Sequence, residues 1–597
     1  MGTETRAKQV RRGVLGAAWR LTRPYWVSGE KWSAWGLLAV VTGLDLGNVY
    51  ISVLLNQWNR AFYNALQQFD SSMFFRQIGI FCILATISIV MSVYAVYLQQ
   101  MLQIRWRRWL TDRYLDAWLA DQAYYRLQLE GHQTDNPDQR ISEDLNSFTS
   151  YVLNLSLGLL TSVVTLFSFL VILWNLSGPA AIPLGSWGHV DIPGYLVWAA
   201  LLYAGFGTWL TVKIGRPLVS LNFAQQRLEA DFRFALMRLR ENAESVALFA
   251  GERSEMKQFR HRFAHVFDNF WAIMKRQKML SWFTVGYGQI AVIFPVVVVA
   301  PRFFARQIKL GGLMQIVSAF GSVQSALSFV VNSYTDIANW FAVTQRLSGF
   351  ETRLDAISTA VNAPQLITVT RGGEGVSVSH LELTLPDGTP ILRDVNFSAA
   401  QGEAVIIVGP TGVGKSTLIR AIAGIWPFGR GKIRLGEGTA LFLPQRPYLP
   451  LGTLAEALCY PNVHDGAPKE RLAHLLVDFG LMELVPHLDT VDNWAHRLSL
   501  GEQQRIGFAR VMLSRPALVF LDEATSAVDE PREARYYQML RDAPWRPTII
   551  SVGHRSTLHE LHDRVLDISD FVCPERAAKA ADISGTGAQE PALSGAK

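Results

Sequence analysis

The segment "VGPTGVGKST", residues 408–417, lies after the apolar run "EAVIIV" and leads into the helix-like stretch "STLIRAIAG". It fits the pattern G-x-x-x-x-G-K-[ST], in which glycines let backbone N–H groups converge on phosphate oxygens. Lys415 in this pattern neutralises the β- and γ-phosphates, and Ser416 ligates Mg²⁺. The predicted phosphate loop and its flank comprise Gly409, Pro410, Thr411, Gly412, Val413, Gly414, Lys415, Ser416 and Thr417. A chance glycine-rich turn would not place strand, loop and helix in this order.

Two carboxylates follow a buried-strand pattern further along, in "ALVFLDE" at 517–523. Asp522 is predicted to hold Mg²⁺ and Glu523 to polarise an attacking water. Alone, a strand ending in solvated acids would be an equally good interpretation; the upstream phosphate loop favours the catalytic one. Short β-rich runs alternate with helical stretches, which predicts a parallel α/β domain over 376–572. The small, polar residues 573–597 are typical of a disordered tail.

The first half of the chain has the composition of a membrane domain. Hydrophobic residues make up 49% of the chain and charged residues 18%. A helix needs about 20 residues to cross the hydrocarbon core. Six apolar stretches come near this length, at 33–57, 77–102, 149–175, 192–214, 281–303 and 313–340. We therefore expect an N-terminal segment at 1–30, a six-span domain at 31–345 and a linker at 346–375.

Basic residues predict the orientation of these spans. Thirteen Lys or Arg residues lie between Lys213 and Lys278, and the segment after the second span is also rich in Arg, whereas 176–191 has none. Lys and Arg favour the cytoplasmic side, so both termini and both long loops are expected there. The loops have apolar residues at helical spacing, which predicts extended helices with tips around 115–135 and 225–245. A separate cytoplasmic domain inserted twice is the alternative.

The stretch "LSLGEQQR", 498–505, resembles the LSGGQ signature of ABC-transporter ATPases, with Leu500 and Glu502 departing from that form. Other motifs of the family occur in the expected order: Gln445 at the Q-loop, 526–529 at the D-loop and His554 at the switch position. The resemblance implies ATP as the nucleotide and Mg²⁺ held by Ser416, Gln445 and Asp522. It assigns catalytic roles to Glu523, His554 and Gln445, and further nucleotide contacts to Ser499, Leu500, Gly501, Glu502 and Asp529.

The resemblance also implies a partner. ABC proteins sandwich ATP between the phosphate loop of one subunit and the signature of the other. One chain with one ATPase domain is then a half-transporter, so a homodimer with two identical composite ATP sites is expected. The family usually stacks adenine on an aromatic residue, but Leu385 occupies that position here. Weaker base recognition is expected, and other nucleotides would then substitute for ATP.

Stretches outside the ATPase motifs resemble subfamily D (peroxisomal acyl-CoA) transporters and bacterial YddA/BacA-like proteins. They are "NPDQRISEDLNSF" (136–148), "ENAESVALFAGE" (241–252), "AGIWPFGRGKI" (423–433) and "FLPQRPYLPLGTL" (442–454). The stretch "WRLTRPYWVSGEKWSAWGLL" (19–38) points to the bacterial branch, with its SbmA/BacA-type membrane domain. This implies a type I exporter (type IV transporter) fold in a bacterial inner membrane. The group includes importers, so the fold does not determine direction.

Polar residues within the spans bear on the cargo, because exposure to lipid costs several kcal/mol. Candidates for a hydrated substrate cavity are Asp45, Asn48, Gln289, Asn332 and Asp336. Hydrogen bonding between helices is the alternative for the amides. The polar set favours uptake of peptides or other hydrophilic solutes over an acyl-chain translocator or exporter. A non-transporting ATP-gated channel or sensor is a third hypothesis, which the intact Glu523 disfavours.

Composition disfavours other partners and sites. The formal net charge is +6, and the basic residues lie mainly between apolar segments. A nucleic-acid partner would call for a basic stripe on a soluble domain, so none is expected. The three cysteines, Cys82, Cys459 and Cys573, are scattered along the chain. Their spacing indicates neither a disulfide framework nor a cysteine metal site.

Overall fold

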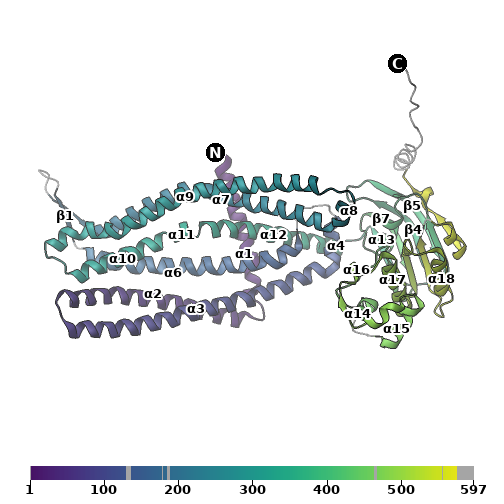
Figure 1. The fold of residues 1–597 in the computed structure, drawn as a ribbon, viewed down its shortest axis with the longest axis horizontal. Helices are drawn as coiled ribbons and strands as arrows, with labels where there is room; N and C mark the ends of the chain where they lie inside the picture. The colour runs from purple at the N-terminus through teal and green to yellow at the C-terminus, as the bar shows by residue number, and fades with distance from the viewer. Residues whose placement is uncertain are drawn as a thin grey trace, which may run out of the picture. The chain divides into compact units, whose positions relative to one another are not determined.

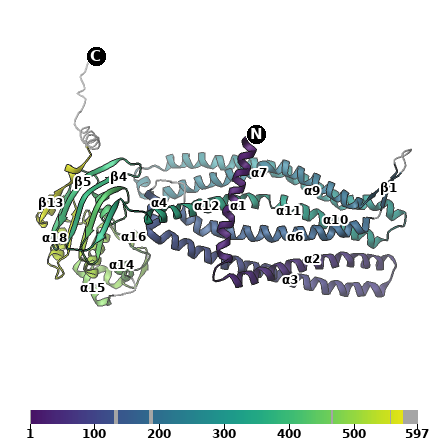
Figure 2. The ribbon, with the colours of Figure 1, turned by 180° about the vertical axis from the view of Figure 1, so that it is seen from behind.

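The computed structural model describes residues 2–129, 136–177, 179–183, 189–462, 467–553 and 555–573. The chain divides into two compact units. One comprises residues 1–118 and 134–354, and the other comprises residues 119–133 and 355–597. The first unit is almost entirely helical, whereas the second combines helices with two main sheets (Figures 1 and 2).

Helices, most of them long, build the first unit. They are α1 Gly2–Trp26, α2 Lys31–Gln67, α3 Ser71–Leu119, α5 Pro137–Gln139, α6 Leu145–Ser177, α7 Tyr195–Glu241, α8 Ala243–Leu248, α9 Glu252–Phe304, α10 Leu310–Leu327, α11 Phe329–Asn332 and α12 Tyr334–Asn362. An antiparallel hairpin of β1 Pro179–Pro183 and β2 His189–Pro193 follows α6. Six helical stretches, containing α2, α3, α6, α7, α9 and α10, have the length and apolar composition to cross a membrane. The expectation of six spans is confirmed.

Apolar faces hold this bundle together. Helices α7 and α9 run side by side over much of their length (Figures 1 and 2). Phe169 of α6, Val299 of α9 and Phe320 of α10 are buried in a shared cluster. Helix α1 buries residues at helical spacing, and its Tyr25 stacks on Trp106 of α3 with ring centroids 5.7 Å apart. The expected N-terminal segment is thus an amphipathic helix packed on the bundle.

Two parts of this unit differ from the expectation from sequence. Helix α7 continues to Glu241, so the second tip lies at 242–251 rather than around 225–245. The helix can continue this far because the sequence has no Gly or Pro between residue 218 and Gly251. The expected span 313–340 is also broken into α10, α11 and α12. Ser328 and Ser333, which have only moderate helix propensity, occupy the two breaks.

A buried ion cluster joins the start of α6 to α12. The Asp144 carboxylate accepts hydrogen bonds from Arg140 at 2.7 Å and from two nitrogens of Arg346 at 2.6 and 2.9 Å. Asp144 and Arg140 are only 4% and 7% exposed. Residues Arg140–Asp144 form a π-helical turn within the stretch "NPDQRISEDLNSF". The buried Asp144 carboxylate therefore binds two guanidinium groups, that of the buried Arg140 and that of Arg346, whose side chain is 38% exposed.

Replacing Asp144 by Asn is expected to lower the free energy of unfolding by about 3–5 kcal/mol, because two arginines lose their buried counter-charge. Thermal unfolding of the purified protein in lipid nanodiscs measures the loss. Glu143→Gln is the matched control, because Glu143 is adjacent and exposed; its effect should stay within about 0.5 kcal/mol. Equal melting temperatures for the two variants would contradict the assignment.

The second unit contains the α/β domain. Its strands are β3 Ile367–Arg371, β4 Val376–Thr384, β5 Pro390–Ala399, β6 Ala404–Val408, β7 Gly429–Leu435, β8 Ala440–Leu443, β9 Gly452–Thr453, β10 Val491–Asp492, β11 Leu518–Asp522, β12 Thr548–Val552 and β13 Arg564–Asp567. Its helices are α4 Ala123–Leu129, α13 Lys415–Ile422, α14 Leu454–Cys459, α15 Lys469–Asp478, α16 Trp494–Arg497, α17 Leu500–Ser514 and α18 Glu530–Arg541. Leu129 of α4 packs against the apolar core of this unit.

A five-stranded sheet of order β13-β6-β12-β11-β8 is parallel throughout. Alternate residues of the central strand β6 enter different cores: Val405 and Ile407 lie in one cluster, and Ala404 and Ile406 in the other. This is the pattern of a strand covered on both faces. The predicted parallel α/β domain is confirmed.

A second sheet, of order β3-β7-β4-β5, includes part of the expected linker 346–375. Helix α12 extends to Asn362, and β3 pairs in parallel with β7. Ile367 is buried in the apolar core of the domain. The segment between the membrane-length helices and residue 376 is therefore largely ordered helix and strand.

Candidate functional site

The parallel sheet determines where the motif residues meet. Strands β6, β8, β11 and β12 are parallel neighbours, so their carboxyl ends lie at one edge. The phosphate loop follows β6, Gln445 follows β8, and Asp522 ends β11. Ligands of open α/β sheets bind at this edge. The strand order thus assembles motifs that are more than a hundred residues apart in the sequence.

The phosphate loop has the backbone geometry that its glycines allow. Gly414 has φ of +117°, and a Cβ there would lie 2.7 Å from the Ile391 side chain. Only glycine fits without displacing that neighbour. Lys415 at the start of α13 is 5% exposed, and its Nζ donates to the carbonyls of Gly409 and Pro410 at 2.7 and 2.9 Å. The ammonium group is therefore held against the loop.

Charges converge beside this loop. The Ser416 hydroxyl donates to Asp522 Oδ1 at 2.9 Å. Burial raises the pKa of Asp522; the Ser416 hydrogen bond opposes this shift and the Glu523 charge adds to it. Burial lowers the pKa of Lys415, against the attraction of Glu523 and Asp522. A hydroxyl next to a partly buried carboxylate is an oxygen-only set of the kind that suits Mg²⁺.

Glu523 is held in an uncommon backbone conformation. Its φ is +49°, in the left-handed region, and its N–H donates to the carbonyl of Val552 at 3.1 Å. Its carboxylate accepts from Gln445 Nε2 at 3.1 Å. Strained residues of this type concentrate at functional sites. The sequence motifs assign catalytic roles to Gln445 and Glu523 separately, and the structure shows that the two side chains are in direct contact.

The signature stretch begins a helix, and Glu502, one of its two departures from LSGGQ, takes part in the helix cap. Ser499 caps α17, and Glu502 completes a capping box by accepting from the Ser499 backbone N–H at 2.8 Å. The Ser499 hydroxyl also donates to Glu502 at 2.7 Å. Leu500 is the first residue of the helix, and Gly501 approaches the backbone of Ala527 closely. Glu502 therefore stabilises the end of the helix that carries the signature.

The remaining predicted residues are placed as follows. Asp529 caps α18 by accepting from the backbone N–H of Arg532 at 3.0 Å. Leu385 begins a turn in which its N–H donates to Thr389, and it packs against the apolar core. His554 lies outside the described residues, so its predicted role stays a prediction.

Two polar side chains that the motifs did not single out connect the loops. Gln504 is fully buried, donates to the carbonyl of Gln445 at 2.8 Å and to Ser526 Oγ at 3.0 Å, and accepts from Ala527 N–H. Arg555 donates to the carbonyl of Val528 at 2.8 Å and pairs with the buried Glu533 at 3.2 Å. The sequence carries one indication that these two side chains matter, namely that each lies next to a motif. The residues that they contact could be identified only from the fold.

None of the five predicted cavity residues is among the described lining residues of three pockets in this structure. Asn48 Oδ1 accepts from Ser88 at 3.2 Å and so joins α2 to α3, which is the packing alternative. Asp45 is half-buried, and Gln289, Asn332 and Asp336 are exposed in the single chain. A pocket of the same unit has none of the five among its described lining residues. That they line a cavity stays a prediction.

Comparison with known proteins agrees with this arrangement. Residues 21–304 match the family described as ABC transporter transmembrane region 2, and residues 392–526 match the ABC transporter family. An ABC transporter ATP-binding protein of Haemophilus influenzae is 38% identical over 89% of this chain and 88% of its own. ABC transporter D family member 2 of Arabidopsis thaliana is 35% identical over 92% and 85%.

Two further matches concern the membrane and the fold. The inner membrane ABC transporter ATP-binding protein YddA of Escherichia coli is 34% identical over 92% of this chain and 96% of its own. The structure of a bacterial Atm1-family ABC exporter with ATP bound superposes with a TM-score of 0.70, over 95% of this chain and 100% of that one, at 18% identity. The chain therefore belongs to the ABC transporter family, as a multi-pass half-transporter related to subfamily D that carries one transmembrane region and one ATP-binding ATPase domain.

Proposed function

We propose that this protein is a homodimeric, ATP-driven transporter that takes up peptides or other hydrophilic solutes across a bacterial inner membrane. The observation that carries the proposal is the assembled phosphate loop and acidic pair in a chain with six membrane-length helices. The relationship to YddA, which is named as an inner membrane protein, supports the location. Both termini are placed in the cytoplasm on the distribution of Lys and Arg.

In the proposed ATPase reaction, Lys415 balances the charge of the β- and γ-phosphates. Glu523 positions water for attack on the γ-phosphate, and Gln445, which contacts Glu523, keeps that carboxylate in place. His554 is assigned to the γ-phosphate. Ser416, Asp522 and Gln445 would hold the Mg²⁺ ion, which supplies further charge neutralisation when bound. The backbone N–H groups of residues 409–417 complete the phosphate cradle.

The second half of each ATP site is proposed to come from the partner. Ser499, Leu500, Gly501, Glu502 and Asp529 lie at exposed or half-buried helix ends in the single chain. The N-terminus of α17 favours a negative ligand such as the γ-phosphate. A second identical subunit would present this end across the nucleotide, and ATP binding would then close the dimer.

The helical tips are proposed to carry that closure to the membrane helices. The first tip includes α4, whose Leu129 packs on the apolar core of the ATPase domain. At the second tip, Leu248 and Phe249 are 79% and 86% exposed. Apolar side chains at such a position favour burial against a partner, which supports placing this tip at the ATPase domain of the second subunit.

Uptake tests the proposal directly. Cells lacking their own peptide importer would express the wild type or Glu523→Gln at equal levels and receive a fluorescent cationic peptide. We expect accumulation in the wild type and none above background in the variant, because import requires ATP hydrolysis. Equal accumulation in the two strains would contradict ATP-driven peptide import. Stimulation of the ATPase by acyl-CoA in nanodiscs would then favour the acyl-chain alternative.

A further inference from the structure

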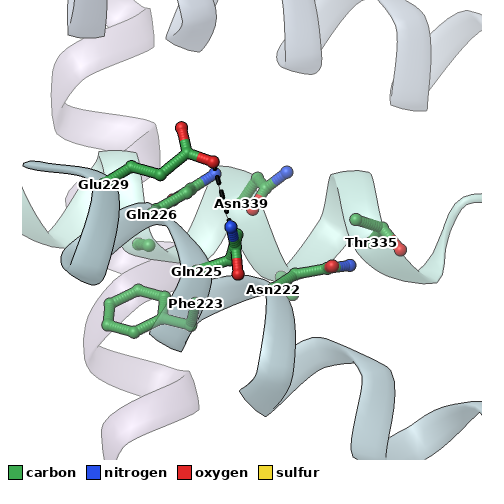
Figure 3. A pocket seen from close by; sticks show the side chains of 9 residues that line it. Asn222, Phe223, Gln225, Gln226, Glu229, Thr335 and Asn339 are labelled. Carbon is green, nitrogen blue, oxygen red and sulfur yellow. Dashed lines mark hydrogen bonds between the residues drawn. The ribbon is translucent and has the colours of Figure 1, made fainter. Parts of the chain in front are cut away.

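A pocket of about 370 Å³, with both polar and apolar lining, lies between α7 and α12 (Figure 3). Its size is at the lower end of the range for small-ligand sites. The lining residues come from one stretch of each helix. They are Asn222, Phe223, Gln225, Gln226, Glu229, Thr335, Ala338, Asn339 and Ala342.

Four of the nine described lining residues are carboxamides, and the lining residues of each helix recur at helical spacing. Residues 222, 225, 226 and 229 lie on one face of α7, and residues 335, 338, 339 and 342 lie on one face of α12. An Asn or Gln amide both donates and accepts hydrogen bonds, as a peptide group does. Phe223, which is 63% exposed, adds an apolar surface at the same place. The amides can hydrogen-bond a peptide backbone, and the apolar part of the lining can contact apolar portions of the same ligand.

Hydrogen bonds from neighbouring helices orient part of this lining. Asn269 of α9 donates to Gln225 Oε1 at 2.8 Å and to the carbonyl of Leu221 at 3.0 Å. Gln225 Nε2 in turn donates to Glu229 Oε1 at 3.0 Å, as the dashed line in Figure 3 marks. Asn269 therefore fixes the Gln225 amide with its donor toward the carboxylate. Such support reduces the entropy lost when a ligand binds.

Glu229 is the one charged residue among the nine described lining residues. Its side chain is exposed, and Gln225 engages one of its two carboxylate oxygens. A carboxylate within a set of neutral amides attracts a cationic group without a competing lysine or arginine in the lining. Guanidinium and ammonium groups are the matching partners.

By its place along α7 the pocket lies beyond the hydrocarbon region. On α12 its described residues other than Ala342 fall within the span 313–340 expected from sequence, but they follow the membrane-length helix α10, which ends at Leu327. Asn222 follows the last residue of the predicted span, 214, by eight residues, or about 12 Å of helix. This is the side on which the Lys- and Arg-rich loops lie. A hydrophilic ligand can therefore occupy the pocket without entering lipid.

We propose that this pocket is a cargo site for short cationic peptides, with Glu229 binding a guanidinium or ammonium group and the surrounding amides binding the backbone. The inference rests on the proposed transport function and gives it a recognition site at the cytoplasmic end of the membrane helices. For an importer, this is the last site occupied before release.

Equilibrium binding of two labelled nonapeptides to the full-length protein in nanodiscs tests the site. One peptide is arginine-rich, and its counterpart has citrulline in place of arginine, which keeps the shape and removes the charge. Glu229→Gln should weaken the arginine peptide about fivefold, near the upper end for an exposed ion pair, and barely change the citrulline peptide. Asp231→Asn is the matched control, because it lies on the same helix two residues away and faces elsewhere; it should change neither.

Gln226→Leu probes the amides separately, since Gln226 is exposed and its replacement leaves the fold intact. It should weaken both peptides alike. Equal losses for Glu229→Gln and Asp231→Asn, or no loss for either, would overturn the site. Uptake measured in cells separates the two proposals: wild-type import that Glu229→Gln leaves unchanged overturns the pocket but not the transporter. If the variants change peptide binding as expected but the wild type imports no peptide, the proposed uptake function is wrong and the assignment of the pocket stands.

Discussion

Replacing Glu523 by Gln is expected to lower ATP turnover by about 10²- to 10⁴-fold, the usual contribution of a positioned general base. The amide has nearly the same shape as the carboxylate and can still contact Gln445, which lies 3.1 Å away. It has lost the negative charge that would orient and polarise water. ATP binding should persist, because Lys415 and the loop backbone remain unchanged.

Phosphate release and binding of a fluorescent ATP analogue, both measured in nanodiscs, separate these two effects. Glu530→Gln is the matched control, because it removes an exposed carboxylate in the first turn of α18. Its turnover should equal that of the wild type. Turnover of Glu523→Gln within fivefold of wild type would show that another group activates the water.

That the motifs of the candidate ATP site converge was predictable from sequence, because these motifs follow parallel strands. Once the runs before Gly409 and Glu523 are recognised as strands of one parallel sheet, their carboxyl ends must meet. What the motifs leave open is the local backbone. The left-handed conformation of Glu523 and the capping box of Ser499 and Glu502 depend on packing and hydrogen bonds around each turn. A family pattern alone presents Glu502 as a departure without explaining it.

The membrane unit was predictable in its number of spans but not in its polar contacts. Hydropathy predicts that Asn48 lies within a span, but it does not predict which side chain Asn48 contacts. In the structure the Ser88 hydroxyl donates to the Asn48 amide and so links α3 to α2. Of the pocket amides, Gln225 lies beyond the predicted span 192–214, whereas Asn339 lies at the end of the predicted span 313–340. That both line one pocket depends on the fold and could not be predicted from either stretch.

Mixed dimers provide the second large effect, because composite sites allow two inactive chains to restore each other. Lys415→Met removes the phosphate-binding ammonium group, and Ser499→Asp places a carboxylate where the partner's γ-phosphate is proposed to lie. Each variant alone should have background turnover. A dimer that combines them has one site with both defects and one with neither. Its expected turnover is about half that of wild type, since one of two symmetric sites is intact.

Asp and Asn cap helices about as well as Ser, but Asp at 499 also lies beside Glu502, which accepts from the Ser499 hydroxyl at 2.7 Å. The melting temperature of each variant is therefore measured with its turnover, so that a loss of folding is distinguished from a loss of the ATP site. Ser499→Asn is then the neutral control and should retain most of its turnover, whereas Ser499→Asp differs from it only in charge. Mixed dimers isolated through two affinity tags report the result. If they are as inactive as either parent, both halves of the ATP site lie in one chain and the composite-site homodimer is wrong.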